Sequence, residues 1–546
     1  MQHMKKILVF ISFFGISVGA TAQLVPLQQQ VQNNLNGLIL QSGSSVFTGF
    51  RSMNWQEWNA SGVLQKSKLS DSIFGMSLSP VGTKRLLNSN WLQWSGKNYA
   101  VTANPILEGT IGKSNDKDGS LFNGGIGANI QGVFFDNKLS FGFEGYRAVN
   151  EFPQYIDEYI AQNDNAVPGE KRVHADSKGR YNYTHIDGYL SYMPSEHISI
   201  TTGYGKLFVG DGYRSLLWSD NADSYPYLRL KAAYWRLTYN VVYSRLNNPD
   251  QLSNGADQGK YSVFHYLGAN VGKHLQLGFF ENLIWLAKDS NYHRGFDVQY
   301  LNPLPVLWPL NFSLGSGDNE FMGFTGKYNL KSGYIYGQFG FDDLNLGQTF
   351  KHKKQHINNK YFFQIGTWQH NIFHVEGLDW RLEWNGVRPY TYGHRDPVGQ
   401  NYTTNHQPIA DPFGANFHEF VSIFNYTKGR WYGVLQDMFT LRGENPGLTY
   451  NNGEDLWGGE AGVPTLGSQT LQGVVHRYFI NQLSLGYLIN PRNRLSIEGN
   501  VGYFVHSAKD FSKNSEFNFS IGIKTNLFNH YYDVAKTHQV MFNYAN

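Results

Sequence analysis

The sequence has no cysteine and little charge, and beyond its first residues it has no apolar run of 18 residues or more. Without cysteine, the chain forms neither disulfides nor thiolate metal sites. The lack of long apolar runs argues against helical membrane spans. The formal net charge is only +3, so the composition gives no reason to expect a nucleic-acid partner.

The N-terminus predicts export. Lys5 and Lys6 precede an uncharged, largely apolar run over residues 7–18, and the small-x-small sequence Ala20-Thr21-Ala22 follows. This order is typical of a cleavable signal peptide, so we assign residues 1–22 to one. An uncleaved membrane anchor is the alternative, but the apolar run is short for a span. No cysteine follows the predicted cleavage site, which argues against a lipoprotein.

Aromatic residues and glycine are abundant, at 16% aromatic residues and 59 glycines against 18 prolines. Together with low charge and an export signal, this composition leaves two candidates, a large secreted β protein and an outer-membrane β-barrel. No change in composition along the chain indicates a linker between domains.

Alternation of apolar and polar residues supports strands in both halves of the chain. In "RLSIEGNVGYFV" (494–505), apolar residues from Leu495 to Val505 alternate with polar residues or glycine, after a turn at 490–493. "EFNFSIGIKTNLF" (516–528) and "WRLTYNVVYSRL" (235–246) show the same period. A hairpin is predicted across Asp136-Asn137.

Strand length favours the barrel over the secreted protein. Many alternating segments run for ten residues or more, whereas strands of soluble proteins usually have five or six. The sequence therefore predicts an all-β, transmembrane outer-membrane β-barrel of about 16 to 18 antiparallel strands over residues 91–534. A barrel this wide is expected to have a polar interior without a packed core. We expect residues 23–90 to form a partly helical periplasmic or lumen-facing segment, and 535–546 to form a C-terminal tail.

Polar insertions interrupt the strands, above all "GDGYRSLLWSDN" at 210–221, and further ones lie at 299–324, 381–397 and 405–420. Two interpretations are compatible. The charged residues brace loops inside the barrel, or they contact carbohydrate while Trp218, Trp384 and Tyr390 stack on sugar rings. The candidate residues for glycan binding or a lumen network are Asp211, Arg214, Trp218, Asp220, Asn221, Asp223, Asp318, Asn319, Trp384, Arg388, Tyr390, His394 and Asn416.

The sequence gives only weak indications of metal binding, hydrolysis or phosphate binding. The histidines His394, His406 and His418 invite a metal site, but their spacing matches no standard ligand pattern. A hydrolase would need a nucleophile beside a base or paired carboxylates, for which Glu383 and Asp396 are the candidates. The string "GYGKLFVGDG" lacks the ending of a phosphate-binding loop. The sequence therefore predicts no catalytic residues, no metal and no cofactor.

The four strings "GDGYRSLLWSDNADSYPYLRL", "QYLNPLPVLWPLNFSLGSGDN", "EWNGVRPYTYGHRDP" and "QPIADPFGANFHEF" resemble the capsule assembly protein Wzi family, in the Bacteroidota branch that includes the gliding motility protein RemB. The resemblance covers roughly residues 90–533. It implies an outer-membrane barrel with a small helical periplasmic element, which holds surface polysaccharide like a lectin and catalyses nothing. The family motifs fall on Asp211, Arg214, Ser219, Asp220, Asn221, Asn302, Asp318, Asn319, Arg388, His394 and Asn416.

The leading hypothesis is thus a non-enzymatic outer-membrane barrel that binds or organises capsular or extracellular polysaccharide, with a role in gliding motility or adhesion as an extension. Its expected partners are this polysaccharide, outer-membrane lipid and gliding or secretion machinery. The alternatives are a porin-type channel and a surface glycan hydrolase. Two segments depart from the family pattern, residues 23–90 and the twelve residues after Val534.

Overall fold

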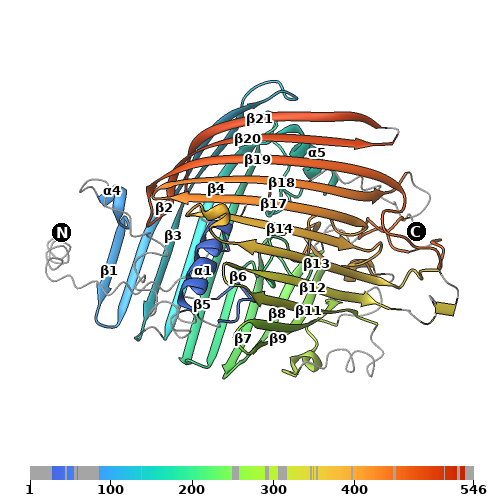
Figure 1. Ribbon diagram of the computed structural model, residues 1–546, viewed down its shortest axis with the longest axis horizontal. Coiled ribbons are helices and arrows are strands. Elements are labelled where there is room, and N and C mark those ends of the chain that lie inside the picture. Colours follow the sequence, from blue (N-terminus) through green and yellow to red (C-terminus); the bar gives the residue numbers. More distant parts are fainter. Residues whose placement is uncertain are drawn as a thin grey trace.

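Long antiparallel strands run side by side around a central lumen in the computed structural model (Figure 1). The structure describes residues 27–43, 46–53, 58, 85–136, 138–248, 258–288, 294–304, 317–344, 347, 350, 351, 354–394, 398–446, 451–460, 462–509, 511–525, 529 and 531–534. The signal peptide and the C-terminal tail predicted from the sequence lie outside these residues.

The main sheet has 19 strands. One of them, the short β1, forms a hairpin with the first half of β2, and the remaining 18 form the barrel wall. The strands are β1 (Leu92–Gly96), β2 (Tyr99–Ser114), β3 (Leu121–Phe134), β4 (Leu139–Glu151), β5 (Tyr181–Ser195), β6 (Ile198–Gly205), β7 (Tyr225–Tyr234), β8 (Leu237–Asn248), β9 (Gln258–Val271), β10 (Leu275–Leu286), β11 (Asn319–Asn329), β12 (Gly333–Asp343), β13 (Lys360–Gln369), β14 (Leu378–Val387), β17 (Phe417–Lys428), β18 (Trp431–Glu444), β19 (Val474–Asn490), β20 (Leu495–Ala508) and β21 (Phe511–Thr525).

Short elements complete the described chain. They are the helices α1 (Gln29–Ser42), α4 (Arg85–Asn88) and α5 (Gln154–Gln162), the 3-10 helices η1 (Val298–Leu301), η2 (Ile372–His374) and η3 (Val398–Gln400), and the small ribbon of β15 (Thr403–Thr404) with β16 (Gln407–Pro408). Helix α1 confirms the helix predicted near the N-terminus, and the left-handed Gly43 ends it. Among the described helices, none is long and apolar enough to cross a bilayer.

The barrel closes between its first and last strands. The second half of β2 pairs with β21, for example Ile111 with Ile521, while the same strand pairs with β3 on its other edge. Every pairing in the wall is antiparallel. Apart from the closing pair of β2 and β21, each pairing joins wall strands that are consecutive along the chain. Closure pairs both edges of the 18-stranded wall, as a bilayer requires, and the short β1 keeps one unpaired edge. The predicted barrel of 16 to 18 strands is confirmed, with an even number of 18.

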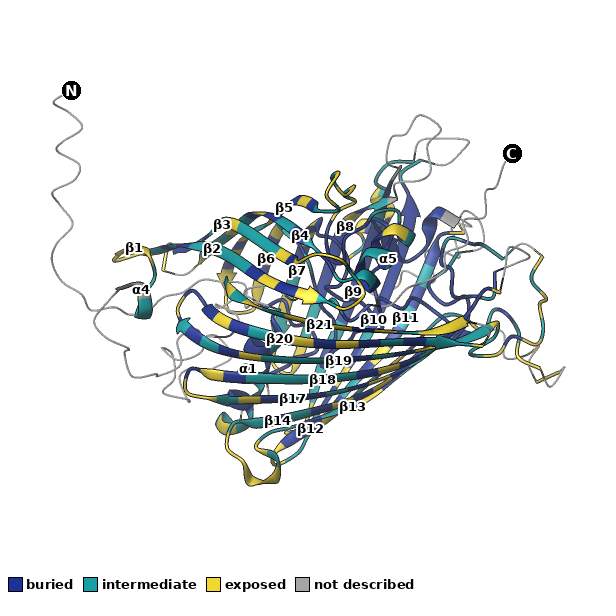
Figure 2. Ribbon diagram, turned by 90° about the horizontal axis from the view of Figure 1, so that it is seen from above, coloured by how far each residue is buried: buried dark blue, intermediate teal, exposed yellow. Residues whose placement is uncertain are grey.

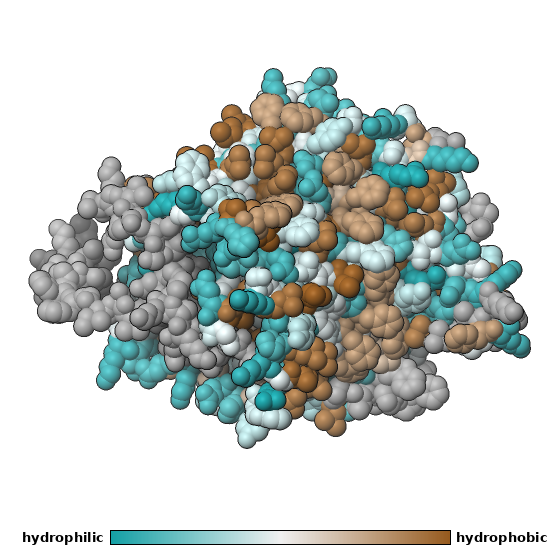
Figure 3. Space-filling model, viewed as in Figure 1, coloured by the Kyte–Doolittle hydropathy of each residue, from teal (hydrophilic) through white to brown (hydrophobic). Residues whose placement is uncertain are grey.

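Side chains alternate between lipid and lumen as predicted. On β21, Phe517, Phe519, Ile521 and Ile523 are exposed on the outside, whereas Glu516 points inward and is buried. Burial changes from residue to residue along the strands in Figure 2, and apolar side chains gather on the outer wall in Figure 3. This is the pattern of a wall between hydrocarbon and a polar lumen.

The two ends of the barrel differ. At one end the strands are joined by short turns, whose tips expose Phe135, Trp235, Phe373 and Trp431 with fractions of 65%, 81%, 79% and 64%. Aromatic side chains at this level match the girdle that marks a membrane interface. At the other end lie the long connections, including 152–180, 206–224 and 388–416.

Part of the outer wall is covered by the chain itself. Residues 294–304 lie against the outer faces of β8 to β10, where Tyr239 and Tyr243 donate hydrogen bonds to the carbonyls of Pro303 (2.5 Å) and Leu301 (3.1 Å). The apolar outward face predicted for "WRLTYNVVYSRL" is therefore real, but its second half packs against protein.

The lumen is filled, and the expectation of an interior without a packed core is wrong. Helix α1 lies inside the barrel (Figures 1 and 2), where Asn36 donates to Tyr334 of the wall at 3.1 Å. The long connections and residues 531–534 also enter the lumen and bring their own apolar side chains. A cluster that includes Phe50, Trp218 and Phe264 forms a core inside the wall. A wide barrel encloses more space than wall side chains can fill, so the loops fill it.

Candidate functional site

The string "GDGYRSLLWSDN" belongs to the connection between β6 and β7, residues 206–224, which folds into the lumen and is buried almost throughout. It packs against the connection between β14 and β17. The backbone N–H of Ser219 donates to the carbonyl of Ile409 at 2.9 Å. In the same β14–β17 connection, the hydroxyl of Tyr402 donates to the carbonyl of Leu217 at 2.6 Å. Two connections far apart in sequence are thus one packed unit.

The two glycines of the string are required by close contacts. Gly210 has a φ of 130°, and a Cβ at this position would collide with the side-chain amide of Gln338. A Cβ on Gly212 would overlap the carboxylate of Glu383 and lie 2.7 Å from the carbonyl of Arg214. Only glycine brings the backbone this near to the barrel wall.

Arg214 is the centre of a buried ion network and is 2% exposed. Its Nη2 lies 3.1 Å from Oε1 of Glu419 on β17 and 3.2 Å from Oδ2 of Asp533 near the C-terminus. A third carboxylate, Asp411, lies 3.8 Å from Nε. One guanidinium therefore joins the string, the wall, the β14–β17 connection and the C-terminal segment, with charge-assisted hydrogen bonds to two of the carboxylates.

The network carries more acid than base. Burial lowers the pKa of Arg214, but Asp533 and Glu419 raise it more, so that its pKa lies well above the usual value. Burial, followed by Glu419, raises the pKa of Asp411 well above its ordinary range. Asp411 therefore binds a proton more readily than an exposed carboxyl group does, which reduces the repulsion between neighbouring acids.

Glu383 on β14 acts as an acceptor for the string. It receives the backbone N–H groups of Tyr213 (2.7 Å) and Arg214 (3.1 Å) and the hydroxyl of Tyr336 (2.7 Å). These bonds hold the turn of the string against the wall. Asp396, which we considered as the second carboxylate of a hydrolase, lies outside the described residues.

Asp211 makes a second anchor. Its carboxylate accepts hydrogen bonds from Thr48 (2.6 Å) and from Lys327 of β11 (3.2 Å), and its carbonyl accepts one from Arg381 (2.7 Å). Burial raises the pKa of Asp211, but Lys327 and the bond from Thr48 lower it more, so that the carboxylate stays ionised. This anchor also includes the segment that follows α1.

The structure contradicts the expected sugar-stacking role for Trp218, Trp384 and Tyr390, the last of which is only 3% exposed. Trp218 has no exposed surface, packs on Phe264 with ring centroids 4.8 Å apart, and lies edge-on to Tyr402 at 5.7 Å. Trp384 is 39% exposed but points outward from β14, stacked on Phe420 at 5.7 Å. Trp218 is a core residue because the loops enclose it, and Trp384 is on the outer face because the strand alternation places it there.

Most of the other predicted residues are engaged inside the barrel or at its rim, whereas Asn302 belongs to the segment 294–304 on the outer face of the wall. Asn302 and His394 are half-buried. The contacts of the remaining residues are Asp220 with the hydroxyl of Tyr531 (2.6 Å), Asn221 with the carbonyl of Pro408 (2.7 Å), Asp223 with the amide of Asn405 (2.5 Å), Asp318 with the hydroxyl of Tyr300 (2.6 Å), Asn319 with the carbonyl of Gln400 (2.8 Å), Arg388 with the carbonyl of Asn359 (3.0 Å), Tyr390 with the carbonyl of Asn451 (2.9 Å) and Asn416 with the carbonyl of Gly443 (2.9 Å).

The metal hypothesis for the three histidines is wrong. His406 lies in the lumen, stacked on Trp457 with centroids 5.3 Å apart. His418 is on the outer face of β17, beside Trp384 at 6.0 Å. The barrel wall separates the two imidazoles, so they cannot share an ion.

The sequence interpretation missed Glu419, Asp533 and Lys327. Glu419 and Lys327 are charged residues at inward positions of alternating strands, so the alternation itself could have identified them as lumen groups. No local pattern indicates that Asp533 returns to Arg214, because 319 residues separate the pair.

A polar cavity of about 290 Å³ remains in the lumen. It lies between α1, the residues Asn529, Tyr531 and Tyr532, and the wall from β18 to β21, and its lining includes Gln436 and Gln482. The side-chain atoms Gln30 Nε2 and Asn33 Oδ1 line it without a hydrogen-bond partner. The lining also carries charged side chains, among them Glu108, Glu498 and Lys524, so it suits water or a small polar solute.

Comparison with known proteins gives a match of structure alone. No family model and no curated sequence matches the chain. The solved structure of Wzi, described as an outer membrane protein involved in group 1 capsule assembly in Escherichia coli and a carbohydrate-binding β-barrel, matches with a TM-score of 0.57 and 13% identity. The match covers 92% of this chain and 99% of Wzi. The likeness is one of fold.

Weaker matches are two proteins of Pseudomonas aeruginosa, the outer membrane protein OprD and OccK1 (OpdK). OprD matches with a TM-score of 0.41 and 9% identity over 79% of this chain and 96% of OprD. OccK1 (OpdK) matches with a TM-score of 0.41 and 9% identity over 77% of this chain and 97% of OccK1. The resemblance to the Wzi family inferred from the four strings is matched by the Wzi structure, at the level of fold alone.

Proposed function

We propose that this chain is a non-enzymatic outer-membrane barrel that binds or organises cell-surface polysaccharide at its long-loop end. The observation that carries the proposal is the packing and bracing of the connections inside the lumen. Arg214 and Asp211 tie the connections, the C-terminal segment and the wall together through buried charges, so the connections form a fixed cap. A fixed cap suits binding better than passage, because a preordered surface loses little conformational entropy when a ligand binds.

The fold supports the proposal, since Wzi has this fold and is described as a carbohydrate-binding barrel. The signal peptide predicted from the sequence and the outward apolar belt agree with a place in the outer membrane. By the usual arrangement of such barrels, the short turns face the periplasm and the long connections face outward. As an extension of this proposal, we place the chain in the RemB-like branch, with a role in gliding motility or adhesion.

An exposed basic segment on the connection 152–180 is the part of the cap that we assign to polysaccharide. Lys171, His174 and Lys178 are exposed there, whereas Arg180 is paired with Asp176 at 2.8 Å. Cationic side chains on an outward loop fit a polysaccharide that carries carboxylate or phosphate groups. The buried string 210–221 then supports this surface and does not itself touch the glycan.

A deletion strain tests the proposal. Loss of the gene is expected to release polysaccharide from the cell surface, and the wild-type gene is expected to restore retention. The charge-reversal pair Lys171→Glu with Lys178→Glu should fail to restore it. The matched pair Lys273→Glu with Lys331→Glu, exposed on turns at the opposite end, should restore it fully. Unchanged retention in the deletion strain would exclude the proposed role.

A porin-type channel is the second candidate, and the polar cavity beside α1 favours it. A conducting lumen would give large, stable current steps in planar bilayers, whereas the braced cap predicts small or absent steps. A surface glycan hydrolase is the third. It requires turnover of the polysaccharide that disappears in the variant Glu383→Gln.

A further inference from the structure

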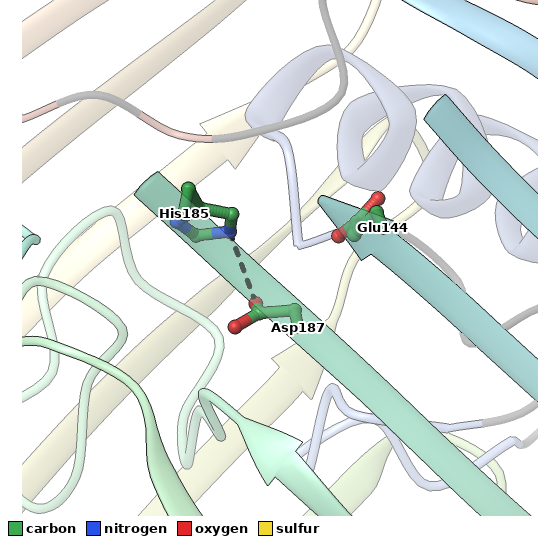
Figure 4. A group of neighbouring side chains, drawn as sticks. All are labelled: Glu144, His185 and Asp187. Carbon is green, nitrogen blue, oxygen red and sulfur yellow. Dashed lines mark ion pairs between the residues drawn. The ribbon is translucent and has the colours of Figure 1, made fainter. Parts of the chain in front are cut away.

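A second group of titratable side chains lies on the lumen side of β4 and β5, away from Arg214. Glu144 on β4 is directly opposite Asp187 on β5, and His185 precedes Asp187 by two residues on the same face. Figure 4 shows the three side chains projecting from the neighbouring strands, with His185 and Asp187 joined by an ion pair. The distance from His185 Nε2 to Asp187 Oδ2 is 3.5 Å, and one ligand atom from each residue lies within 4.8 Å of the others.

Each of the three side chains is held from behind by another group. Glu170 lies 2.9 Å from Nδ1 of His185, which turns Nε2 toward the carboxylates. Asn129 donates to Oε2 of Glu144 at 3.1 Å, and Ser224 donates to Oδ1 of Asp187 at 2.6 Å. In metal sites, a carboxylate on the second imidazole nitrogen and donors to the ligating carboxylates fix the ligands in this way.

The charges of the group also call for a cation. Three carboxylates, Glu144, Glu170 and Asp187, surround one imidazole, so negative charge exceeds positive charge even when the imidazole is protonated. His185 and Glu170 are each 5% exposed. Lys206, whose Nζ lies 2.6 Å from the carbonyl of Gly169, offsets part of this charge. Buried negative charge is costly, and a divalent ion between the ligands would neutralise more of it.

We propose that Glu144, His185 and Asp187 bind a divalent transition-metal ion, with Glu170 as the residue that orients His185. One imidazole nitrogen and two carboxylates favour Zn²⁺ or Mn²⁺ over Mg²⁺, because imidazole is a poor ligand for the harder ion. The assignment of this site does not rest on the proposed polysaccharide binding.

The site would fasten the cap to the wall. Glu170 belongs to the connection 152–180 and Ser224 to the connection 206–224, whereas the ligands stand on β4 and β5. The backbone N–H of Gly169 and the carbonyl of Glu170 are further bound to Gln407 at 2.7 Å and 2.6 Å. A metal ion at His185 would therefore stabilise the place where three connections meet the barrel.

The test uses the purified full-length protein in detergent, stripped with a chelator and then titrated with Zn²⁺ and, separately, with Mn²⁺. Binding of one ion per chain, measured by calorimetry and elemental analysis, is expected. The variant Asp187→Asn should abolish it, and Glu170→Gln should weaken it by about 10- to 100-fold. The control His197→Gln, which removes an exposed histidine 3.7 Å from Glu196 at the opposite end, should bind like wild type.

Two further readouts make the result decisive. X-ray absorption of the Zn²⁺ form should show one nitrogen ligand with oxygen ligands. Hydrogen exchange in residues 163–173 should slow when the metal is added. Variants are compared only when they migrate as folded barrels in unheated gels. Retention of no ion by wild type, or equal affinity in wild type and Asp187→Asn, would overturn the proposal.

Discussion

The variant Arg214→Leu tests the internal bracing of the cap. At 3.1 Å from Glu419, a single ion pair is worth about 5 kcal/mol before desolvation at an effective dielectric constant of ~20. Desolvation offsets part of this energy, and removing one partner of a buried pair typically costs about 3–5 kcal/mol, because the other charges stay buried. We therefore expect the free energy of unfolding at pH 7 to fall by about 3–5 kcal/mol.

The pH dependence distinguishes this cause from lost packing. Burial raises the pKa of Asp411 well above its ordinary range, so this carboxyl group binds a proton as the pH falls and then needs no cation. The difference between variant and wild type should therefore shrink at pH 4. Urea unfolding followed by tryptophan fluorescence, at both pH values, measures the difference. The control Arg236→Leu, at an exposed arginine in a short turn, should change stability by no more than about 0.5 kcal/mol. A loss below about 1 kcal/mol at pH 7, or one that persists undiminished at pH 4, would refute the reasoning.

Two other predictions concern the cap and the wall. Burial, then Glu170, raises the pKa of Asp223 to about 7, and burial raises that of Glu454 to about 8. Since the folded state then binds more protons, stability should fall as pH rises from about 4 to about 8. Asp223→Asn should reduce the fall of the unfolding free energy with pH by up to ~1.4 kcal/mol per pH unit. Urea midpoints of the variant that match those of wild type across this pH range would argue against the prediction. Trp218→Ala should cost about 3–5 kcal/mol and Trp384→Ala clearly less in the same assay, because only the first leaves a cavity in packed protein; equal losses would contradict the assignment of Trp384 to the outer face.

The wall could be predicted from the sequence because the bilayer imposes it. Every strand that meets lipid must alternate, and the residues from Phe517 to Ile523 do so without exception on their outward side. The same rule, applied to β14, places Trp384 with Leu382 on the outside. The alternation alone is therefore enough to exclude Trp384 as a sugar-stacking residue in the lumen. Alternation does not show what covers a face, which is why the outer packing of Tyr243 was not foreseen.

The interior could be predicted only in part. The charged string 210–221 indicates buried bracing through its residue types, and the glycines at 210 and 212 indicate a tight turn. Its partners Glu419 and Asp533 lie about 200 and 320 residues away in sequence, and spacing carries no information at that range. The packed lumen was missed because a strand pattern describes the wall, while connections decide what fills the space inside.

Binding of the purified, detergent-held barrel to polysaccharide extracted from its own cells tests the central claim most directly. The account predicts that wild type and the Lys273→Glu, Lys331→Glu pair bind alike, that the Lys171→Glu, Lys178→Glu pair binds at least tenfold more weakly, and that added salt weakens the wild-type complex, as expected for ion contacts on an exposed surface. Absence of binding by the folded wild-type barrel, or equal binding by both charge-reversal pairs, would contradict it.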